Sequence, residues 1–268
     1  MGMFFEEHAK LLSEFARVSQ AAGARADYVQ GGGGNTSVKL PGGLMAIKAS
    51  GFCLSDIRPD KAYAVLDGAD LRNFYLTTEP SELADVEKEG SARAKADIRH
   101  IDGLADLRPS VEAGFHSILK TFVVHTHSVY ANLAACSTTC RPIAAQAFAG
   151  ANYTWGWVPH TDPGANLTFA IRDELRRVEA ETGKAPSVIL MQNHGIIVHD
   201  DDPDTALAIH TDANERLARM FGLSGTSFPK IAVREIAAGI YAADVPYLAE
   251  QFRTGGYTQE FLMTQPLY

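Results

Sequence analysis

Two histidines, His125 and His127, close a short apolar segment, residues 122–127, which reads Phe-Val-Val-His-Thr-His. A β-strand alternates its side chains between two faces, so residues spaced i and i+2 point to the same side. On a helix the same two positions would lie well apart around the axis. Two imidazoles that converge at a strand end form half of a divalent-metal site, and their nitrogen atoms suit zinc.

A third histidine, His194, occupies a comparable place further along the chain. Residues 187–192 form a continuous apolar segment typical of a strand, and a second strand, residues 196–198, follows Asn193-His194-Gly195 at once. We therefore expect His194 in a tight link where strand ends meet. Three protein ligands with an open fourth position are the pattern of a catalytic zinc site. From spacing alone, ordinary core or surface roles for these histidines stay equally open.

The most unusual stretch of the sequence is a run of four glycines, residues 31–34, followed by Asn35. A nucleotide-binding glycine loop must open a helix. Here residues 36–40 alternate polar and apolar side chains, and a turn leads into a second strand-like segment, residues 44–49, so both nucleotide motifs are rejected. A flexible surface loop is one interpretation. The other is an anion site, because glycine backbone N–H groups approach an anion closely and the turn Ser50-Gly51 adds further donors.

The remaining pattern predicts helices around these strands. A further strand is expected at residues 62–66, and hairpins with flanking helices predict a mixed α/β sandwich. The expected helices cover residues 4–22, 79–99, 108–120, 128–137, 167–182 and 202–221. Glu112 falls in the first turn of one of them, where a carboxylate stabilises the helix dipole without any catalytic role.

Composition limits the function classes. The chain has 268 residues, 46% of them apolar, and no linker-like stretch, so we expect a single domain over residues 1–268. A net charge of −8 with scattered Lys and Arg argues against nucleic-acid and anionic-membrane partners. Three cysteines are too few for a disulfide framework, and the N-terminal residues lack a secretory signal pattern. We therefore expect a cytoplasmic protein.

Four motifs in order resemble the class II aldolase/adducin family. They are Gly-Gly-Asn-Thr-Ser-Val, Pro-Ser-x-Glu, Val-Val-His-Thr-His and Gln-Asn-His-Gly, and the resemblance covers roughly residues 8 to 222. The glycine-rich form is most similar to rhamnulose-phosphate aldolase domains. The resemblance implies a three-layer α/β/α sandwich with a central, mainly antiparallel sheet, in a homotetramer with sites at subunit interfaces.

The resemblance also implies roles for individual residues. Zinc, or another divalent metal, would be held by His125, His127 and His194. Glu112 would be the acid/base group, which replaces the helix-dipole interpretation. The implied phosphate cradle consists of Gly34, Asn35, Ser50, Gly51 and Ser110. One departure is Val111, which stands where fuculose-phosphate aldolase has a second serine, and the spacing from Glu112 to His125 is also shorter than in that enzyme.

These parts predict a zinc-dependent aldolase, a carbon–carbon lyase that cleaves a short phosphorylated ketose of the fuculose- or rhamnulose-1-phosphate type. Metal-stabilised enediolate chemistry would replace a lysine Schiff base. His160, in a loop, is an auxiliary acid or a plain surface residue, and Lys48 reaches an anion or is exposed. Epimerase, sugar-acid phosphate decarboxylase and dehydratase activities fit the same motifs nearly as well. The non-enzymatic alternative is an adducin-like interaction module.

Overall fold

The computed structural model describes residues 3–223, 231–255 and 258. The chain groups into two compact units, Met1–Gly222 and Leu223–Tyr268. Each unit is described by itself below. The single domain expected over residues 1–268 stays a prediction, and its last ten residues, 259–268, lie outside the described part of the chain.

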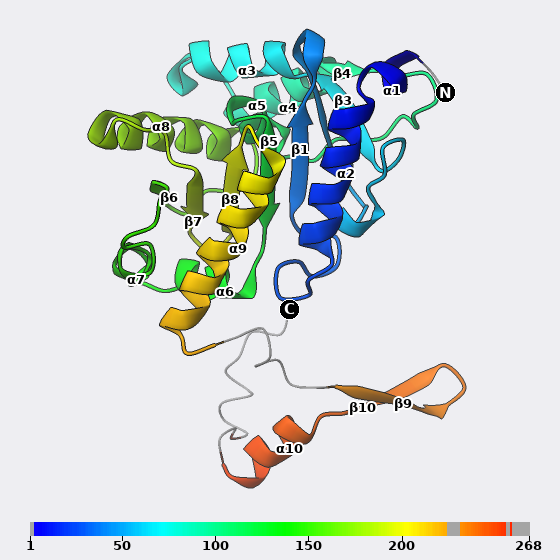
Figure 1. Ribbon diagram of the computed structural model, residues 1–268, viewed down its shortest axis with the longest axis vertical. Coiled ribbons are helices and arrows are strands. Elements are labelled where there is room, and N and C mark those ends of the chain that lie inside the picture. The colour runs from blue at the N-terminus through cyan, green and yellow to red at the C-terminus, as the bar shows by residue number, and fades with distance from the viewer. Residues whose placement is uncertain (1–2, 224–230, 256–257, 259–268) are drawn as a thin grey trace. The chain divides into compact units, whose positions relative to one another are not determined.

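The first unit is built on one eight-stranded sheet (Figure 1). Its strands are β1 (Asn35–Lys39), β2 (Leu44–Lys48), β3 (Tyr63–Asp67), β4 (Ile98–Arg99), β5 (Phe122–Thr126), β6 (Trp155–Val158), β7 (Val188–Met191) and β8 (Gly195–Asp200). The spatial order is β4-β3-β2-β1-β5-β8-β7-β6, and every neighbouring pair is antiparallel except β6 with β7. The mainly antiparallel sheet that the family resemblance implied is thus confirmed.

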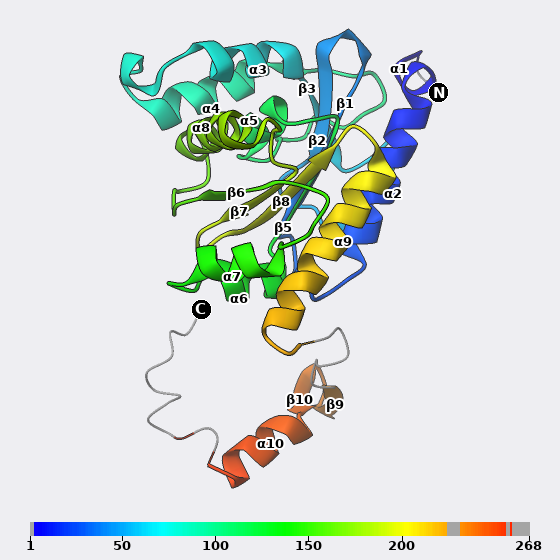
Figure 2. The same ribbon diagram turned by 60° about the vertical axis from the view of Figure 1, so that its left-hand side comes forward.

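Helices cover both faces of this sheet, which gives three layers (Figure 2). The helices of the first unit are α1 (Met3–Glu7), α2 (Ala9–Gly23), α3 (Gly68–Thr77), α4 (Val86–Ala96), α5 (Ala113–Ile118), α6 (Val129–Ala135), α7 (Cys140–Ala147), α8 (Ala165–Thr182) and α9 (Pro203–Met220). α2 and α9 pack on one face, and α3, α4, α5 and α8 lie on the other. The predicted α/β/α sandwich is confirmed.

The core lies on both sides of the sheet. On the α3–α5–α8 side, fully buried Phe115 and Ile171 pack with sheet residues such as Ile47 and Ile189. On the α2–α9 side, the buried Phe15 contacts the ring of Tyr63 edge-on at 5.7 Å. Burying each such side chain stabilises the fold by roughly 1.5–3 kcal/mol. The sheet is therefore held rigidly from both faces.

Side-chain caps explain where several helices begin. Asp202 accepts a hydrogen bond from the Thr205 N–H at 2.8 Å, and Pro203 occupies the first helical position of α9. Glu87 on α4 accepts from the first N–H groups of α8. The continuous helix expected over residues 79–99 is wrong, because Asp85 caps a new start at α4 by accepting from the Lys88 N–H at 3.0 Å. A 3₁₀ turn, η3 (Pro80–Glu82), precedes it, and β4 follows it.

The second unit contains a two-stranded antiparallel ribbon, β9 (Ala232–Ala237) with β10 (Ile240–Asp244), and a helix, α10 (Pro246–Arg253). The pattern of the sequence predicted none of these elements. Across all described residues, no helix combines the length and apolar character needed to cross a membrane.

Candidate metal centre

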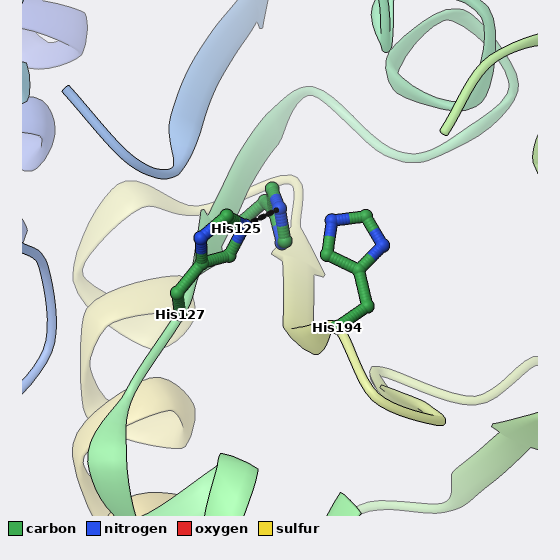
Figure 3. Close-up of side chains that lie close together, drawn as sticks. All are labelled: His125, His127 and His194. Atoms are coloured by element: carbon green, nitrogen blue, oxygen red, sulfur yellow. Dashed lines mark hydrogen bonds between the residues drawn. The ribbon is translucent and has the colours of Figure 1, made fainter. Parts of the chain in front are cut away.

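The His-x-His pair sits at the end of a central strand. β5 is hydrogen-bonded to β1 on one side and to β8 on the other, with His125 opposite Asn35 and Ile197. His127 follows the strand directly. Because the chain is extended here, both rings lie on the same side, as the i, i+2 spacing predicted (Figure 3).

His194 joins the pair from the tight link between β7 and β8 (Figure 3). The link turns through Asn193, which adopts the left-handed region at φ 55°. It also depends on Gly195, where any Cβ atom would collide with the Thr126 carbonyl oxygen of β5. A glycine there lets the link approach β5 closely enough for His194 to reach the other two rings.

The three rings form a compact group of donors. Each histidine offers one ring nitrogen, and these three atoms all lie within 4.8 Å of one another. His125 Nε2 and His127 Nε2 are 3.1 Å apart. His125 pairs its Nδ1 with the Ile196 carbonyl at 3.0 Å. When Nδ1 donates in this contact, Nε2 is left with a lone pair directed into the group, which is how metal-binding histidines are oriented. The donor set therefore fits a divalent ion such as zinc.

Burial favours the neutral, metal-binding form of the His125 and His127 imidazoles. The protein interior lowers the pKa of His125 to about 3, mainly by desolvation. Desolvation also lowers the pKa of His127, and the neighbouring His194 adds to this effect. Neutral rings bind a cation without first losing a proton.

Glu112 lies directly beside the three histidines. Its Oε1 is 3.0 Å from His194 Nε2, and its Oε2 is 3.5 Å from His125 Nε2. The residue occupies the N-cap position of α5 but makes no capping hydrogen bond with its side chain. The helix-dipole interpretation thus accounts for its position in the sequence and not for its contacts.

The surroundings of Glu112 favour its carboxylate form. Burial raises the pKa of this carboxyl, but the nearby rings of His125 and His194 and the hydrogen bond from Asn35 together lower it by more, so the pKa lies below its usual range. The Asn35 amide donates to Glu112 Oε2 at 2.5 Å. The same amide nitrogen lies 3.0 Å from the Ser110 hydroxyl oxygen.

The residues of the predicted phosphate cradle gather at the same end of the sheet. An isolated bridge pairs Ala49 with Pro109, and the Ser50 hydroxyl donates to the Pro109 carbonyl at 3.1 Å. This pairing places the exposed turn Ser50-Gly51 next to Ser110. Gly34 adopts φ 69°, and a Cβ there would be 2.6 Å from the His125 carbonyl oxygen. The absence of a side chain therefore lets Gly34 pack directly against β5. The anion-binding role of these five residues stays a prediction.

For Lys48 and for His160, the sequence left two interpretations open. Lys48 is buried, and its Nζ donates to the Phe52 carbonyl at 2.8 Å and the Gly32 carbonyl at 3.2 Å, so the exposed alternative is wrong. It fastens the glycine run to the turn after β2.

His160 is exposed, and its backbone N–H donates to Gln192 at 3.0 Å. Its proposed acid role stays untested.

One residue near the centre, His116 on α5, was missed entirely. It is fully buried and contacts three alternate residues of β1. Its Nδ1 pairs with the Ser37 hydroxyl at 2.7 Å, its Nε2 pairs with the Asn35 side-chain oxygen, and its carbonyl accepts from Lys39 Nζ. His116 therefore fixes which way the Asn35 amide faces, and with it the hydrogen bond to Glu112. A single histidine in an apolar helix gives no sequence pattern that would have revealed this.

An α/β/α fold with three converging imidazoles and an adjoining carboxylate defines a protein able to hold a metal ion at a strand end. Residues 13–221 match the sequence model of the family described as Class II Aldolase and Adducin N-terminal domain. The chain belongs to this family. A search of curated proteins finds no match.

Solved structures share the fold at low sequence identity. The N-terminal class II aldolase domain of a conserved Thermoplasma acidophilum protein is 20% identical with a TM-score of 0.63, over 78% of this chain and 92% of that one. YgbL of Klebsiella pneumoniae, titled a putative aldolase/epimerase/decarboxylase, is 18% identical with a TM-score of 0.54, over 82% and 91%. A sugar-phosphate aldolase of Thermotoga maritima is 16% identical with a TM-score of 0.51, over 80% and 96%.

Proposed function

We propose that this protein is a zinc-dependent aldolase that cleaves a short phosphorylated ketose of the fuculose- or rhamnulose-1-phosphate type. One observation carries the proposal: three ring nitrogens lie within 4.8 Å of one another, with the Glu112 carboxylate 3.0 Å from one of the rings. A divalent ion and an acid/base group are the two requirements of this chemistry. Family membership supports the same reaction class.

In this proposal each residue has a defined task. His125, His127 and His194 hold the ion, and a bound divalent ion supplies Lewis-acid stabilisation of negative charge on the sugar oxygens. Glu112 moves the proton at the carbon that becomes nucleophilic when the carbon–carbon bond breaks. Its burial removes competing water, and the Asn35 amide holds the carboxylate in place.

The phosphate of the substrate would anchor the remote end of the molecule. Gly34, Asn35, Ser50, Gly51 and Ser110 form the proposed cradle. Binding energy from a group distant from the reacting carbons orients the substrate for reaction. We further propose a cytoplasmic homotetramer, with no nucleic-acid or membrane partner.

Three related enzyme activities use the same site chemistry. An epimerase, a sugar-acid phosphate decarboxylase and a dehydratase would all depend on an enediolate that a metal ion stabilises. An adducin-like interaction module is the non-enzymatic alternative, and the complete set of three histidines and Glu112 speaks against it.

The test combines metal analysis with a substrate panel. Purified protein is analysed for bound metals and incubated with L-fuculose 1-phosphate, L-rhamnulose 1-phosphate, L-ribulose 5-phosphate and a sugar-acid phosphate, and the products are identified. Release of dihydroxyacetone phosphate from a 1-phosphate ketose supports the aldolase. Folded protein without a divalent metal would favour the interaction module. Turnover restricted to non-phosphorylated sugars would reject the cradle.

A further inference from the structure

A cavity of about 680 Å³ lies at the opposite end of the strands from His125, His127 and His194. β1 begins at Asn35 beside the metal centre and ends at Lys39 on the cavity wall. β8 begins next to His194 and reaches the cavity with His199. Helices α3, α5 and α8, which share one face of the sheet in Figure 2, supply the other walls. The cavity is thus separate from the proposed catalytic site.

The cavity wall is rich in cationic side chains. They are Lys39, Arg72, Lys120, Arg172 and Arg176, while two wall residues, Glu179 and Asp201, are acidic. Three of these cations have carboxylate partners close by. Lys120 pairs with Asp200 at 2.8 Å. Arg172 pairs with Asp173 at 2.9 Å, and Arg176 reaches the same carboxylate at 3.9 Å.

Lys39 and Arg72 differ from the others. Among the ion pairs of the described residues, neither has a carboxylate partner within 4.0 Å. Both donate to backbone carbonyls at the end of α5 instead. Lys39 contacts the His116 carbonyl, and Arg72 donates to the Ile118 carbonyl at 2.6 Å. Carbonyl partners leave both side chains without a carboxylate at contact distance.

His199 adds a neutral group with free hydrogen-bonding capacity. It lines the cavity and is only 3% exposed. Neither ring nitrogen makes a hydrogen bond to a described residue; burial lowers the pKa of the ring to about 3, and the Pro186 backbone opposes this shift. A buried polar group without a partner costs stability, so its presence beside two cations that lack a carboxylate at contact distance points to a missing ligand.

We propose that this cavity is a second ligand site, which binds a small phosphate-bearing anion through Lys39, Arg72 and His199. A phosphate group would accept from the remaining Nζ–H groups of Lys39 and from the Arg72 guanidinium, which suits tetrahedral oxyanions. His199 would donate a further hydrogen bond. Apolar wall residues, including Leu40, Leu76 and Leu175, leave room for a small organic group attached to the phosphate.

The ionisation of Lys39 gives this binding a distinct signature. Burial, and next the charge of Arg72, lower the pKa of Lys39 to about 7, while Asp201 opposes the shift. His116 and His199 are the other titratable groups that sense its charge. A bound anion favours the charged amine, so binding above pH 7 would take up a proton, and binding well below pH 7 would not.

Calorimetric titration of the full-length protein with inorganic pyrophosphate tests the proposal. We expect saturable binding at pH 8, with a heat that depends on the ionisation enthalpy of the buffer; the part of this binding that belongs to the cavity is the part lost when Lys39 or Arg72 is replaced. Lys39→Met and Arg72→Met should each weaken binding at least 10-fold. Arg58→Met is the matched control for Arg72→Met, because Arg58, like Arg72, is exposed and donates to two backbone carbonyls. This substitution should leave binding unchanged.

Two further arms separate this site from others. His125→Ala should retain pyrophosphate binding at the cavity, because the three-histidine centre is not part of it. Loss of binding in His125→Ala but not in Arg72→Met would overturn the proposal. Absence of saturable binding in the unaltered protein would do the same. Citrate serves as a polycarboxylate comparison, and tighter binding of citrate than of pyrophosphate would refute the assignment to phosphate. If Lys39→Met fails to fold, the folded Arg72→Met variant decides.

Discussion

The side-chain amide of Asn35 donates to Oε2 of Glu112 over 2.5 Å, and both residues are buried. The opposite end of this amide faces His116. Asn35 therefore joins the first residue of β1 to the proposed acid/base group. The sequence pattern suggested only an anion contact for Asn35, whereas its position also makes it a support for Glu112.

Replacing Asn35 should impair turnover more than metal binding. Asn35→Ala removes the donor to Glu112, and we expect kcat to fall by about 10- to 100-fold, since general acid–base catalysis contributes ~10²–10⁴. Metal content should stay within about twofold, because Asn35 contacts none of the three histidine rings. Steady-state kinetics and metal analysis measure both quantities. Asn73→Ala, at an exposed position of α3, is the control. A loss of metal equal to the loss of kcat would contradict this role.

Removing His194 should empty the metal centre. Only two protein ligands would remain, and since loss of a supporting contact to a ligand already costs about 10- to 100-fold in affinity, we expect loss of a ligand to cost more than ~100-fold. The affinity is measured by competition with a chelator of known strength. His100→Ala is the control, because His100 is exposed and distant in sequence from all three ligands. Equal metal affinity in the two variants would remove His194 from the centre.

Gly34 and Gly31 form a matched pair for testing backbone packing. Both have positive φ, 69° and 55°, but only a side chain at Gly34 would meet a neighbour, the His125 carbonyl oxygen at 2.6 Å. We expect Gly31→Ala to cost about 1–2 kcal/mol of unfolding free energy through backbone strain alone. Gly34→Ala should cost roughly 1–3 kcal/mol more, through the collision, and should weaken metal binding. Urea unfolding of both variants checks this, and equal values would argue against close packing at β5.

Lys39 should give the unfolding free energy a pH dependence. Its folded-state pKa of about 7 lies below the ordinary lysine value of 10.5. Between pH 7 and pH 10.5 the unfolded chain binds more protons at Lys39 than the folded chain does, so the free energy of unfolding rises with pH across this window. Below pH 7 the full cost of burying the charged amine is present. The Lys39→Met substitution removes this contribution to the pH dependence of the unfolding free energy. We expect the stability of Lys39→Met relative to the unaltered protein to be highest at pH 7 and to decrease towards pH 10. Lys10→Met, on an exposed position of α2, should show no such trend.

Periodicity located most of the sheet and one half of the site. The alternation at residues 36–40 and 44–49 corresponds to β1 and β2, and His125 with His127 ends β5 as expected. These strands are buried on both faces, and they were predictable because short runs of strand-favouring residues bounded by turn residues are typical of buried strands. β6 (Trp155–Val158) was not predicted, since a four-residue strand containing glycine offers too short a pattern.

Contacts between distant segments could not be predicted from pattern. The meeting of Glu112 with His194 joins residues 82 positions apart, and only the family resemblance indicated it. The hydrogen bonds of His116 to alternate residues of β1 depend on how α5 docks on the sheet. The cavity near Lys39 is lined by residues of several separate elements, among them β1, β8, α3, α5 and α8. Local propensity contains no information about any of these arrangements.

The different settings of the three histidines determine how the centre can adjust to ions of different radius. His125 belongs to a strand with hydrogen-bonded neighbours on both sides, so its backbone cannot shift without disturbing two ladders. His194 sits in a short reversal of the chain between two strands. We therefore expect that a larger cation would be accommodated by movement of His194, and that a substitution that stiffens this reversal would narrow the range of ions that the three rings could hold.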